Sequence, residues 1–409
     1  MSIVDKIFDE VLNRKSIFKN RRVLSIDYVP ETLPHREKEI EKLAKILATA
    51  LKGGKPSNVF EYGKTGTGKT AVILYVLNKL IQKAKKYNLH FAAAYVNTRM
   101  YNTPYKVLYK TATELGIKVP RTGLAVADIF EKVLRRIDML ESFVVIVLDE
   151  IDYLVKKKEG NDILYRLTRI NNELENSQVS VIGITNDLRF KEFLDARVLS
   201  SLSEESIVFE PYTVEQLYDI LKQRAELAFI DGAIDDSTLR LIAALSARES
   251  GDARKAIDLL RIAGEIAERE GAEKITEQHV RMAYEEVERD IIKAAIKSLP
   301  HQEKLVLLAI ALLFTKSKKV TTGVVKKMYE KLCEITGTPP VTLRRMNDFI
   351  NDLETLGLVS CQIVSFGRYG RTKVISLEIP SQTVFLVLTE ADPLLAEILK
   401  DWSPFKFDT

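Results

Sequence analysis

The chain has 409 residues, 46% of them hydrophobic and 29% charged, a composition typical of a folded protein with two or three domains. The longest apolar run, residues 305–314, is too short to span a bilayer, and the acidic N-terminus lacks the apolar core of a signal peptide. Two distant cysteines exclude a disulfide framework, so we expect a reduced, cytoplasmic protein with no membrane partner.

The formal net charge of +4 is unevenly distributed along the chain. Residues 291–409 hold 16 Lys and Arg against 12 Asp and Glu, whereas residues 1–290 hold 45 of each sign. The whole positive excess therefore belongs to the C-terminal part, which indicates an anionic partner there.

The first 62 residues lead into a nucleotide-binding pattern. Apolar residues recur with helical spacing across residues 1–20 and residues 36–51, which predicts a helix over each stretch. Residues 25–34 contain two prolines, so we expect this lead-in to be extended. A short apolar run, residues 59–62, then predicts a buried strand.

A phosphate-binding loop follows that strand. Residues 63–70 match the pattern G-x-x-x-x-G-K-[ST] at every fixed position, and an apolar helix comes next. In this context glycines let backbone N–H groups converge on a phosphate, the lysine supplies positive charge, and the last hydroxyl is a ligand for Mg²⁺. The alternative is a glycine-rich turn that happens to contain Lys-Thr. The predicted nucleotide contacts are Gly63, Gly66, Thr67, Gly68, Lys69 and Thr70.

Four further apolar runs predict strands over residues 91–96, 143–148, 179–185 and 207–210, with helical stretches between them. Strands that are rich in Val and Ile and alternate with helices are typical of an α/β fold, in which a parallel sheet is covered on both faces.

Candidate catalytic groups stand at the ends of the third and fourth of the five predicted strands. Asp149 and Glu150 come directly after a buried strand, at the edge where ligands bind in such sheets. Asp149 is suited to hold Mg²⁺ together with Thr70, and Glu150 to deprotonate a water aimed at the γ-phosphate. Asn186 follows the next strand and would position that water. The alternative is a set of surface polar groups without a chemical role.

The remaining chain predicts two more domains. Residues 211–290 contain only helical patterns, the first of them after Thr213 as N-cap. From residue 300 three helices are followed by Gly357 and by two strands, which is the winged helix-turn-helix layout. We therefore expect domains at residues 1–210, 211–296 and 297–409.

Arginines concentrate on two elements of the C-terminal domain that meet DNA in winged-helix proteins. Polar residues open its third helix, whose N-terminal end reads base edges, and further ones lie on the loop between the strands. The alternative is a winged domain that contacts proteins. The candidate DNA-binding residues are Thr342, Arg344, Arg345, Asn347, Arg368, Tyr369 and Arg371.

The order of these motifs resembles that of AAA+ ATPases. After the phosphate loop come Asp149-Glu150, Asn186, residues 194–202 and residues 251–256. Together with a C-terminal winged helix, the set resembles the archaeal origin-recognition and cell-division-control family of replication initiators and helicase loaders. That family is related to the largest subunit of the eukaryotic origin recognition complex and to its loader partner, and the resemblance covers roughly residues 25–378.

The resemblance implies further roles. Asn186 corresponds to sensor 1, Arg254 to sensor 2, and Arg197 to an arginine finger offered to a neighbour's nucleotide. It also implies an initiator-specific helical insert with a DNA contact on residues 116–123, although a solvated loop is the alternative there. The resemblance also places residues 26–30 and Arg36 at the adenine pocket. The residues carried over as further contacts are Val29, Pro30, Tyr212 and Arg224 for ATP, and Lys118 and Arg121 for DNA. Ordinary surface arginines are the alternative for Arg224 and Arg254, and packing at the domain joint is the alternative for Tyr212.

We therefore expect a slow, Mg²⁺-dependent ATPase that binds ATP and ADP, recognises double-stranded origin DNA and regulates loading of the replicative helicase. Its other expected partners are paralogous initiator subunits, and its expected location is the cytoplasm, associated with the nucleoid. Two alternatives stay open: a clamp-loader-like AAA+ subunit, and a transcription regulator that uses ATP as a structural ligand.

Overall fold

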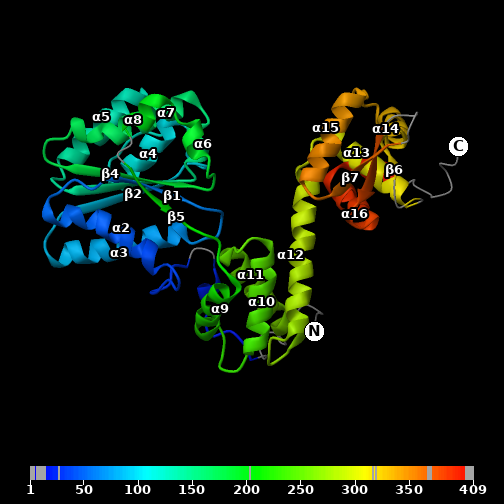
Figure 1. Cartoon of the computed structure of the whole chain (residues 1–409), viewed down its shortest axis with the longest axis horizontal. Helices are drawn as coiled ribbons and strands as arrows, with labels where there is room; N and C mark the ends of the chain where they lie inside the picture. The colour runs from blue at the N-terminus through cyan, green and yellow to red at the C-terminus, as the bar shows by residue number, and fades with distance from the viewer. Residues whose placement is uncertain are drawn as a thin grey trace. The chain divides into compact units, whose positions relative to one another are not determined.

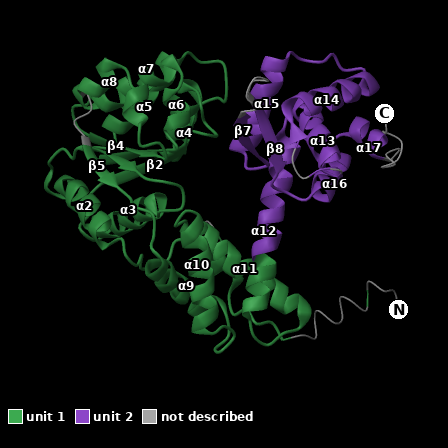
Figure 2. Cartoon of the chain, turned by 45° about the vertical axis from the view of Figure 1, so that its right-hand side comes forward, with its two compact units in different colours: residues 1–283 green, residues 284–409 purple. Residues whose placement is uncertain are grey.

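The computed structural model describes residues 5, 15–25, 28–201, 204–315, 317, 320–365 and 371–400. Two compact units, residues 1–283 and residues 284–409, are shown in green and purple in Figure 2. Each unit has a hydrophobic core of its own.

A five-stranded parallel sheet forms the centre of the ATPase part of unit 1 (Figure 1). The strand order is β2-β3-β4-β1-β5, so the strand before the phosphate loop lies between two others. The strands are β1 (Asn58–Tyr62), β2 (Phe91–Asn97), β3 (Phe143–Asp149), β4 (Gln178–Thr185) and β5 (Glu204–Val208). The expected α/β class is confirmed. The last strand begins three residues before the expected start, because its register is set by pairing with β1.

Helices cover both faces of this sheet. Figure 1 shows α2 and α3 on one face, and α4, α5 and α7 on the other. Each face of the sheet has its own hydrophobic core, and successive residues of β1 point into different cores. Val59 packs with α2 and α3, while Phe60 packs with the opposite layer. The helices are α2 (Glu37–Ala48), α3 (Lys69–Lys86), α4 (Pro104–Glu114), α5 (Val126–Asp138), α6 (Asp152–Val155), α7 (Lys158–Arg169) and α8 (Ala196–Ser201).

A helical lid completes unit 1, with Thr213 and Gln216 forming the capping box that starts its first helix. Its fourth helix continues across residue 283 into unit 2. The lid helices are α9 (Val214–Ala228), α10 (Asp236–Glu249), α11 (Ala253–Glu270) and α12 (Glu277–Ser298).

The helix expected over residues 1–20 is wrong for residues 15–20. Instead of helical turns, Phe18 forms an isolated bridge with Phe229 of the lid, and the two rings lie 4.8 Å apart. Gly264 leaves room for both rings, because a Cβ there would lie 2.8 Å from each. Tertiary pairing with the lid therefore overrides the local helical pattern.

Unit 2 has the winged helix-turn-helix architecture. From Leu305 onward its helix α13 is apolar on all sides, and this part is the buried centre around which the other elements pack. A small antiparallel sheet has the order β6-β8-β7, and two C-terminal helices that the sequence reading did not foresee cover the same core. The elements are α13 (His301–Phe314), β6 (Val320–Thr321), α14 (Thr322–Thr336), α15 (Leu343–Thr355), β7 (Val359–Ser365), β8 (Arg371–Leu377), α16 (Ser381–Ala391) and α17 (Pro393–Lys400).

Among the described residues, no helix combines the length and the apolar character needed to cross a membrane.

Candidate nucleotide-binding and DNA-binding sites

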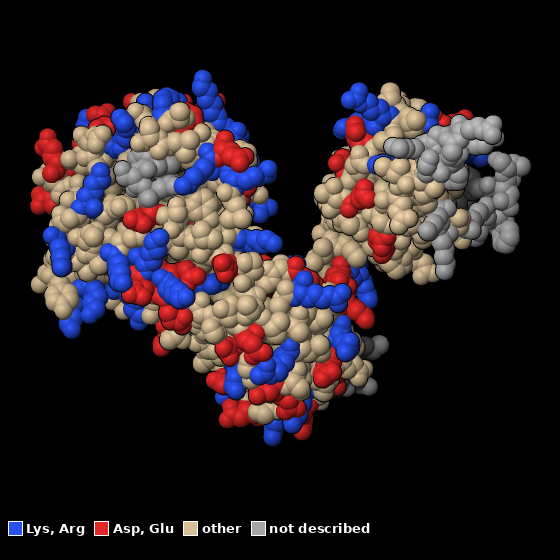
Figure 3. All heavy atoms as spheres, viewed as in Figure 1, with Lys and Arg blue, Asp and Glu red and all other residues tan. Residues whose placement is uncertain are grey.

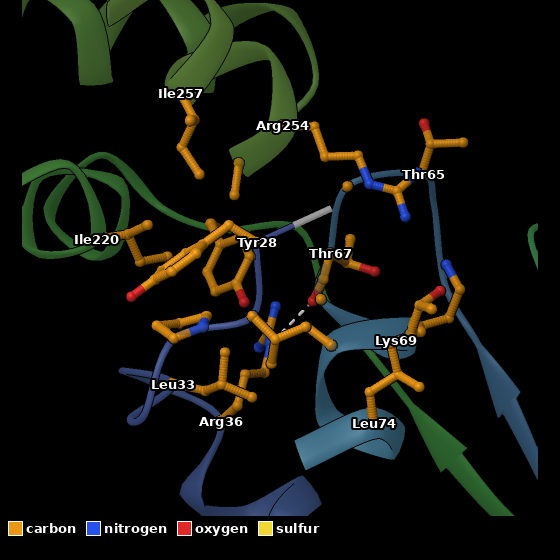
Figure 4. A pocket seen from close by; sticks show the side chains of 18 of the residues that line it. Tyr28, Leu33, Arg36, Thr65, Thr67, Lys69, Leu74, Ile220, Arg254 and Ile257 are labelled. Carbon is orange, nitrogen blue, oxygen red and sulfur yellow. Dashed lines mark hydrogen bonds between the residues drawn. The ribbon is translucent and has the colours of Figure 1, made fainter. Parts of the chain in front are cut away.

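A pocket of about 610 Å³ opens at the phosphate loop of unit 1 (Figure 4). Its walls come from the lead-in, the phosphate loop, the ends of the strands and the lid helices α9 and α11. Gly63 and Arg197 do not line it. The predicted site residues that it brings together are Val29, Pro30, Gly66, Thr67, Gly68, Lys69, Thr70, Asp149, Glu150, Asn186, Tyr212, Arg224 and Arg254.

The lid packs directly against the phosphate loop at two glycines. Gly66 and Gly68 have φ angles of 70° and 92°, which favour glycine. A Cβ at Gly66 would lie 1.7 Å from a carboxylate oxygen of Asp252, and one at Gly68 would lie 2.7 Å from the Tyr212 hydroxyl. Both positions therefore require glycine for close approach as well as for backbone conformation. The sequence reading had not singled out Asp252, which caps α11.

Lys69 is held in place by the loop itself. Its Nζ donates to the carbonyls of Gly63 and Lys64, both at 2.6 Å, and the residue is only 5% exposed. Burial lowers the pKa of Lys69 to about 8, against the opposing influence of Asp149 and Glu61. The ammonium group is therefore a poised cation, for which an anion in the pocket would be a favourable partner.

Asp149 collects three donors from three segments. One carboxylate oxygen accepts from the Thr70 hydroxyl at 3.1 Å and from the Tyr95 hydroxyl, and the other accepts from the Glu150 N–H at 2.8 Å. The Thr70 and Asp149 oxygens are hard ligands that lie next to each other, so this donor set fits Mg²⁺. Tyr95, on the neighbouring strand β2, was not foreseen.

Asn186 is held by a buried acid that the sequence reading did not assign a role. Asp152 is 6% exposed, and its carboxylate accepts from the Thr185 hydroxyl and from the Asn186 N–H, the latter at 3.4 Å. The end of β4 is thereby tied to the segment that carries Asp149. An acid three residues after Asp149 was the only signal that the sequence offered.

Arg36 links the lead-in to both the loop and the lid. It is 4% exposed, and it donates to the carbonyls of Thr67 at 2.9 Å and Glu210 at 2.7 Å. Its guanidinium also stacks on Tyr212, 3.9 Å from the ring centroid. Figure 4 shows the hydrogen bond between Arg36 and Thr67 at the floor of the pocket. Tyr212 thus packs at the joint between lid and loop.

Arg224 ties α9 to the lead-in through backbone carbonyls. It donates to Val23 at 2.9 Å and to Tyr28 at 3.2 Å, and it lies over the Tyr28 ring. Its contacts therefore position the apolar wall of the pocket, while a contact with nucleotide stays a prediction.

The two other predicted arginines differ in their surroundings. Arg254 reaches from α11 toward the phosphate loop beside Thr65 (Figure 4). Arg197 is 56% exposed outside the pocket and forms ion pairs with Asp162 at 3.0 Å and Asp195 at 2.7 Å. Its role as an arginine finger for the nucleotide of a neighbouring subunit stays a prediction.

Helix α15 presents the predicted base-reading residues at its N-terminal end. Thr342 caps the helix through the Arg345 N–H, and Arg344 and Arg345 are exposed. Arg345 lies over the buried Phe349, whereas Asn347 is partly buried. In the view of Figure 3, Lys and Arg side chains of unit 2 gather at its upper edge, over α15.

The structure describes the insert loop, residues 116–123, but not the wing between β7 and β8, residues 366–370. Arg368 and Tyr369 lie outside the described residues, and Arg371 is the first residue of β8. Lys118 and Arg121 are exposed on the loop between α4 and α5. That loop is anchored, because the Tyr105 hydroxyl donates to the carbonyl of Pro120 at 3.1 Å.

Family models match most of the chain. They are described as an ATPase domain predominantly from Archaea (residues 34–226), a Cdc6 AAA+ ATPase-type lid domain (residues 218–285) and a CDC6 C-terminal winged helix domain (residues 294–386).

Full-length relatives agree with these matches. The chain is 50% identical to an ORC1-type DNA replication protein 1 of Sulfurisphaera tokodaii over 97% of this chain and 99% of that protein. It is 51% identical to an ORC1-type DNA replication protein of Pyrococcus horikoshii over 97% of each. Its fold matches the Aeropyrum pernix ORC1 protein, solved in complex with DNA, with a TM-score of 0.81 and 47% identity over 94% of this chain and 99% of that one. The chain therefore belongs to the ORC1/Cdc6-type family of DNA replication initiators, which are AAA+ ATPases with a C-terminal winged helix.

Proposed function

We propose that this protein binds ATP in the pocket of unit 1, hydrolyses it slowly with Mg²⁺, binds duplex DNA at a replication origin, and regulates helicase loading through its nucleotide state. The observation that carries the proposal is the convergence of the phosphate loop, both acids and Arg254 on one pocket. The functional domains that we assign are residues 1–210, 211–296 and 297–409.

We assign each group in the pocket a role in ATP binding or hydrolysis. Lys69 and the loop N–H groups bind the phosphates, since a buried ammonium gains most from an anionic partner. Thr70 and Asp149 would hold Mg²⁺, which neutralises phosphate charge when bound. Glu150 deprotonates the attacking water, and Asn186 orients it.

The position of the lid would depend on which nucleotide is bound in the pocket. Asp252, Tyr212 and Arg254 all belong to the lid or its joint, and the first two lie against the glycines of the phosphate loop. A γ-phosphate that attracts Arg254 would therefore favour one lid position over another. We propose that this difference is what the helicase-loading step reads.

Duplex binding is assigned to the winged domain and to the insert loop. The related Aeropyrum pernix ORC1 protein was solved in complex with DNA. In this chain the exposed Arg344 and Arg345 suit base edges, and Lys118 and Arg121 suit phosphates. Binding by both would give a longer footprint than a single winged domain covers.

Footprinting on the protein's own genomic origin, in ATP and in ADP, tests the proposal. We expect protection of origin duplex over a scrambled duplex of equal length, and helicase recruitment that differs between the two nucleotides. Equal protection of both duplexes would favour a clamp-loader-like subunit. A stable ATP complex that is never hydrolysed would favour a regulator with ATP as a structural ligand.

A further inference from the structure

We propose that Thr98 is a positioning residue for ATP hydrolysis, because its hydroxyl fixes the backbone from which Glu150 is aimed. Thr98 follows the last residue of β2 and does not line the pocket. The inference rests on the proposed function, because it concerns how Glu150 is held rather than whether Glu150 is the base.

The backbone of Glu150 has an unusual conformation. Its φ angle is +53°, one of four positive values among the described non-glycine residues, and side chains disfavour this region. Such a conformation persists only where its surroundings hold it. At this position it turns the chain sharply between the buried strand β3 and helix α6.

One oxygen of the Glu150 carboxylate is not held by any hydrogen bond among the described residues. This oxygen, Oε2, is buried. Among the described residues, the hydrogen bonds of Glu150 involve its backbone N–H and carbonyl, so the direction of the side chain follows from the conformation of the residue that carries it. An error of about 1 Å in such a group is enough to slow catalysis greatly.

Thr98 holds the two peptide groups on either side of that conformation. Its N–H donates to the carbonyl of Asp149 at 2.8 Å, and its hydroxyl donates to the carbonyl of Glu150 at 2.6 Å. The Tyr153 N–H also donates to the Glu150 carbonyl, at 3.1 Å. Thr98 is the donor that comes from outside the turn, directly after the neighbouring strand β2, so it ties the turn to the sheet.

Thr98 is itself rigidly placed. The residue is fully buried, and the ladder between β2 and β3 ends just before it, where Asn97 pairs with Asp149. A fully buried side chain directly after a paired strand loses little further entropy when its hydroxyl makes a hydrogen bond. The hydroxyl therefore acts as a fixed reference for the catalytic turn.

The test compares Thr98→Val, which keeps the shape and removes the hydroxyl, with Thr98→Ser, which restores it. We expect Thr98→Val to lower single-turnover ATP hydrolysis roughly tenfold while the Kd for ATP changes less than about twofold. Thr98→Ser should recover most of the rate. In a Glu150→Gln background, Thr98→Val should cause no further loss.

Thr111→Val is the matched control. Thr111 is also fully buried, and its hydroxyl donates to the carbonyl of Val107 at 2.9 Å within α4, away from the pocket. It should reproduce any loss of stability and leave hydrolysis unchanged. Wild-type hydrolysis in Thr98→Val, or an equal loss in Thr111→Val, would overturn the inference.

A crystal structure of Thr98→Val judges the inference without turnover. Glu150 is expected to leave the left-handed region or its carboxylate to move away from the γ-phosphate side of the pocket. A Glu150 turn identical to that of the wild type would overturn the positioning role. If the wild type failed to hydrolyse ATP, the proposed function would fail, and this structure would still decide what Thr98 does.

Discussion

The nucleotide pocket and the recognition helix present their functional groups in opposite ways. In the pocket Lys69, Asp149 and Arg36 are each at least 94% buried, and each already makes two or more hydrogen bonds to the protein. On α15 Arg344 and Arg345 stand in solvent, and Arg345 is 3.8 Å from Asp348. One region is preorganised, whereas the other would gain its main partners only on binding DNA, as we propose.

This difference decides how each region should respond to substitution. Removing a buried, hydrogen-bonded group leaves its partners unsatisfied, so effects in the pocket should be large and specific to one step. Removing an exposed arginine costs the protein little before DNA binds. Its effect should appear in binding, and for phosphate contacts it should depend on salt.

The largest expected effect is that of Glu150→Gln on turnover. Loss of a general base typically lowers the rate by about 10²–10⁴-fold. ATP binding should persist, since the amide keeps the shape. Single-turnover hydrolysis and equilibrium binding measured on the same preparation check this, and equal hydrolysis by the variant and the wild type would remove Glu150 from the mechanism.

Lys69→Ala should weaken ATP binding by about 100-fold or more, which corresponds to about 2.7 kcal/mol. The phosphates lose the buried ammonium that the loop carbonyls hold in place. Titration with a fluorescent ATP analogue measures the loss. Lys64→Ala is the control, because that side chain is exposed and its carbonyl is unaffected; equal losses in both would contradict a specific role.

Arg344→Ala should weaken origin binding by about 1–3 kcal/mol and relax the preference for origin over scrambled duplex. The residue is exposed near the start of α15, so the fold should be unaffected. Affinities for both duplexes at a fixed salt concentration check the ratio. A uniform loss on both would reassign Arg344 to phosphate contact.

The affinity for ATP in EDTA should fall as the pH rises above about 8, by at most about tenfold per unit. Burial lowers the pKa of Lys69 to about 8 in the nucleotide-free protein, and phosphates favour its protonated form. The contribution of Lys69 to the free energy of unfolding changes in the opposite direction. Between a pH of about 8 and 10.5 this lysine binds a proton in the unfolded chain more often than in the folded protein, so its contribution to stability rises with pH. Titrations at pH 7, 8 and 9 test the affinity, and a flat profile would contradict it.

The smallest expected effect is that of Lys118→Ala with Arg121→Ala. Loss of two exposed phosphate contacts should lower the salt slope of DNA binding by about one unit per charge, on origin and scrambled duplexes alike. If the double variant kept the wild-type slope and footprint length, the ATPase domain would make no DNA contact through this loop.

The nucleotide site was predictable where chemistry and local pattern coincide. Apolar runs predict the strands of the sheet, and the functional residues follow these strands directly along the chain. They are the phosphate loop after β1, the acids at the end of β3 and Asn186 after β4, and the pocket brings them together. Short-range steric preference and burial decide such elements, so a window of a few residues contains the information.

The groups that hold these residues in position were not predictable in the same way. Thr98 meets Glu150 across 52 positions, and Arg36 meets Glu210 across 174. Nothing in the neighbourhood of a buried threonine or arginine says which distant carbonyl will accept its hydrogen bond. The packing of the sheet and the lid decides that.

The N-terminal segment and the end of unit 2 give the same lesson for the fold. Residues 17–19 have a helical pattern, yet they pair with residues 228–230 of the lid. The helices α16 and α17 have apolar residues that are buried in the core formed around α13, a contact between segments that are distant in the sequence. The sequence alone therefore determined the parallel sheet, the phosphate loop and its acids, because these depend on neighbours along the chain. Which segments cover the cores, and which buried donors hold the turn at Glu150, depended on contacts between distant residues, and only the tertiary structure decided them.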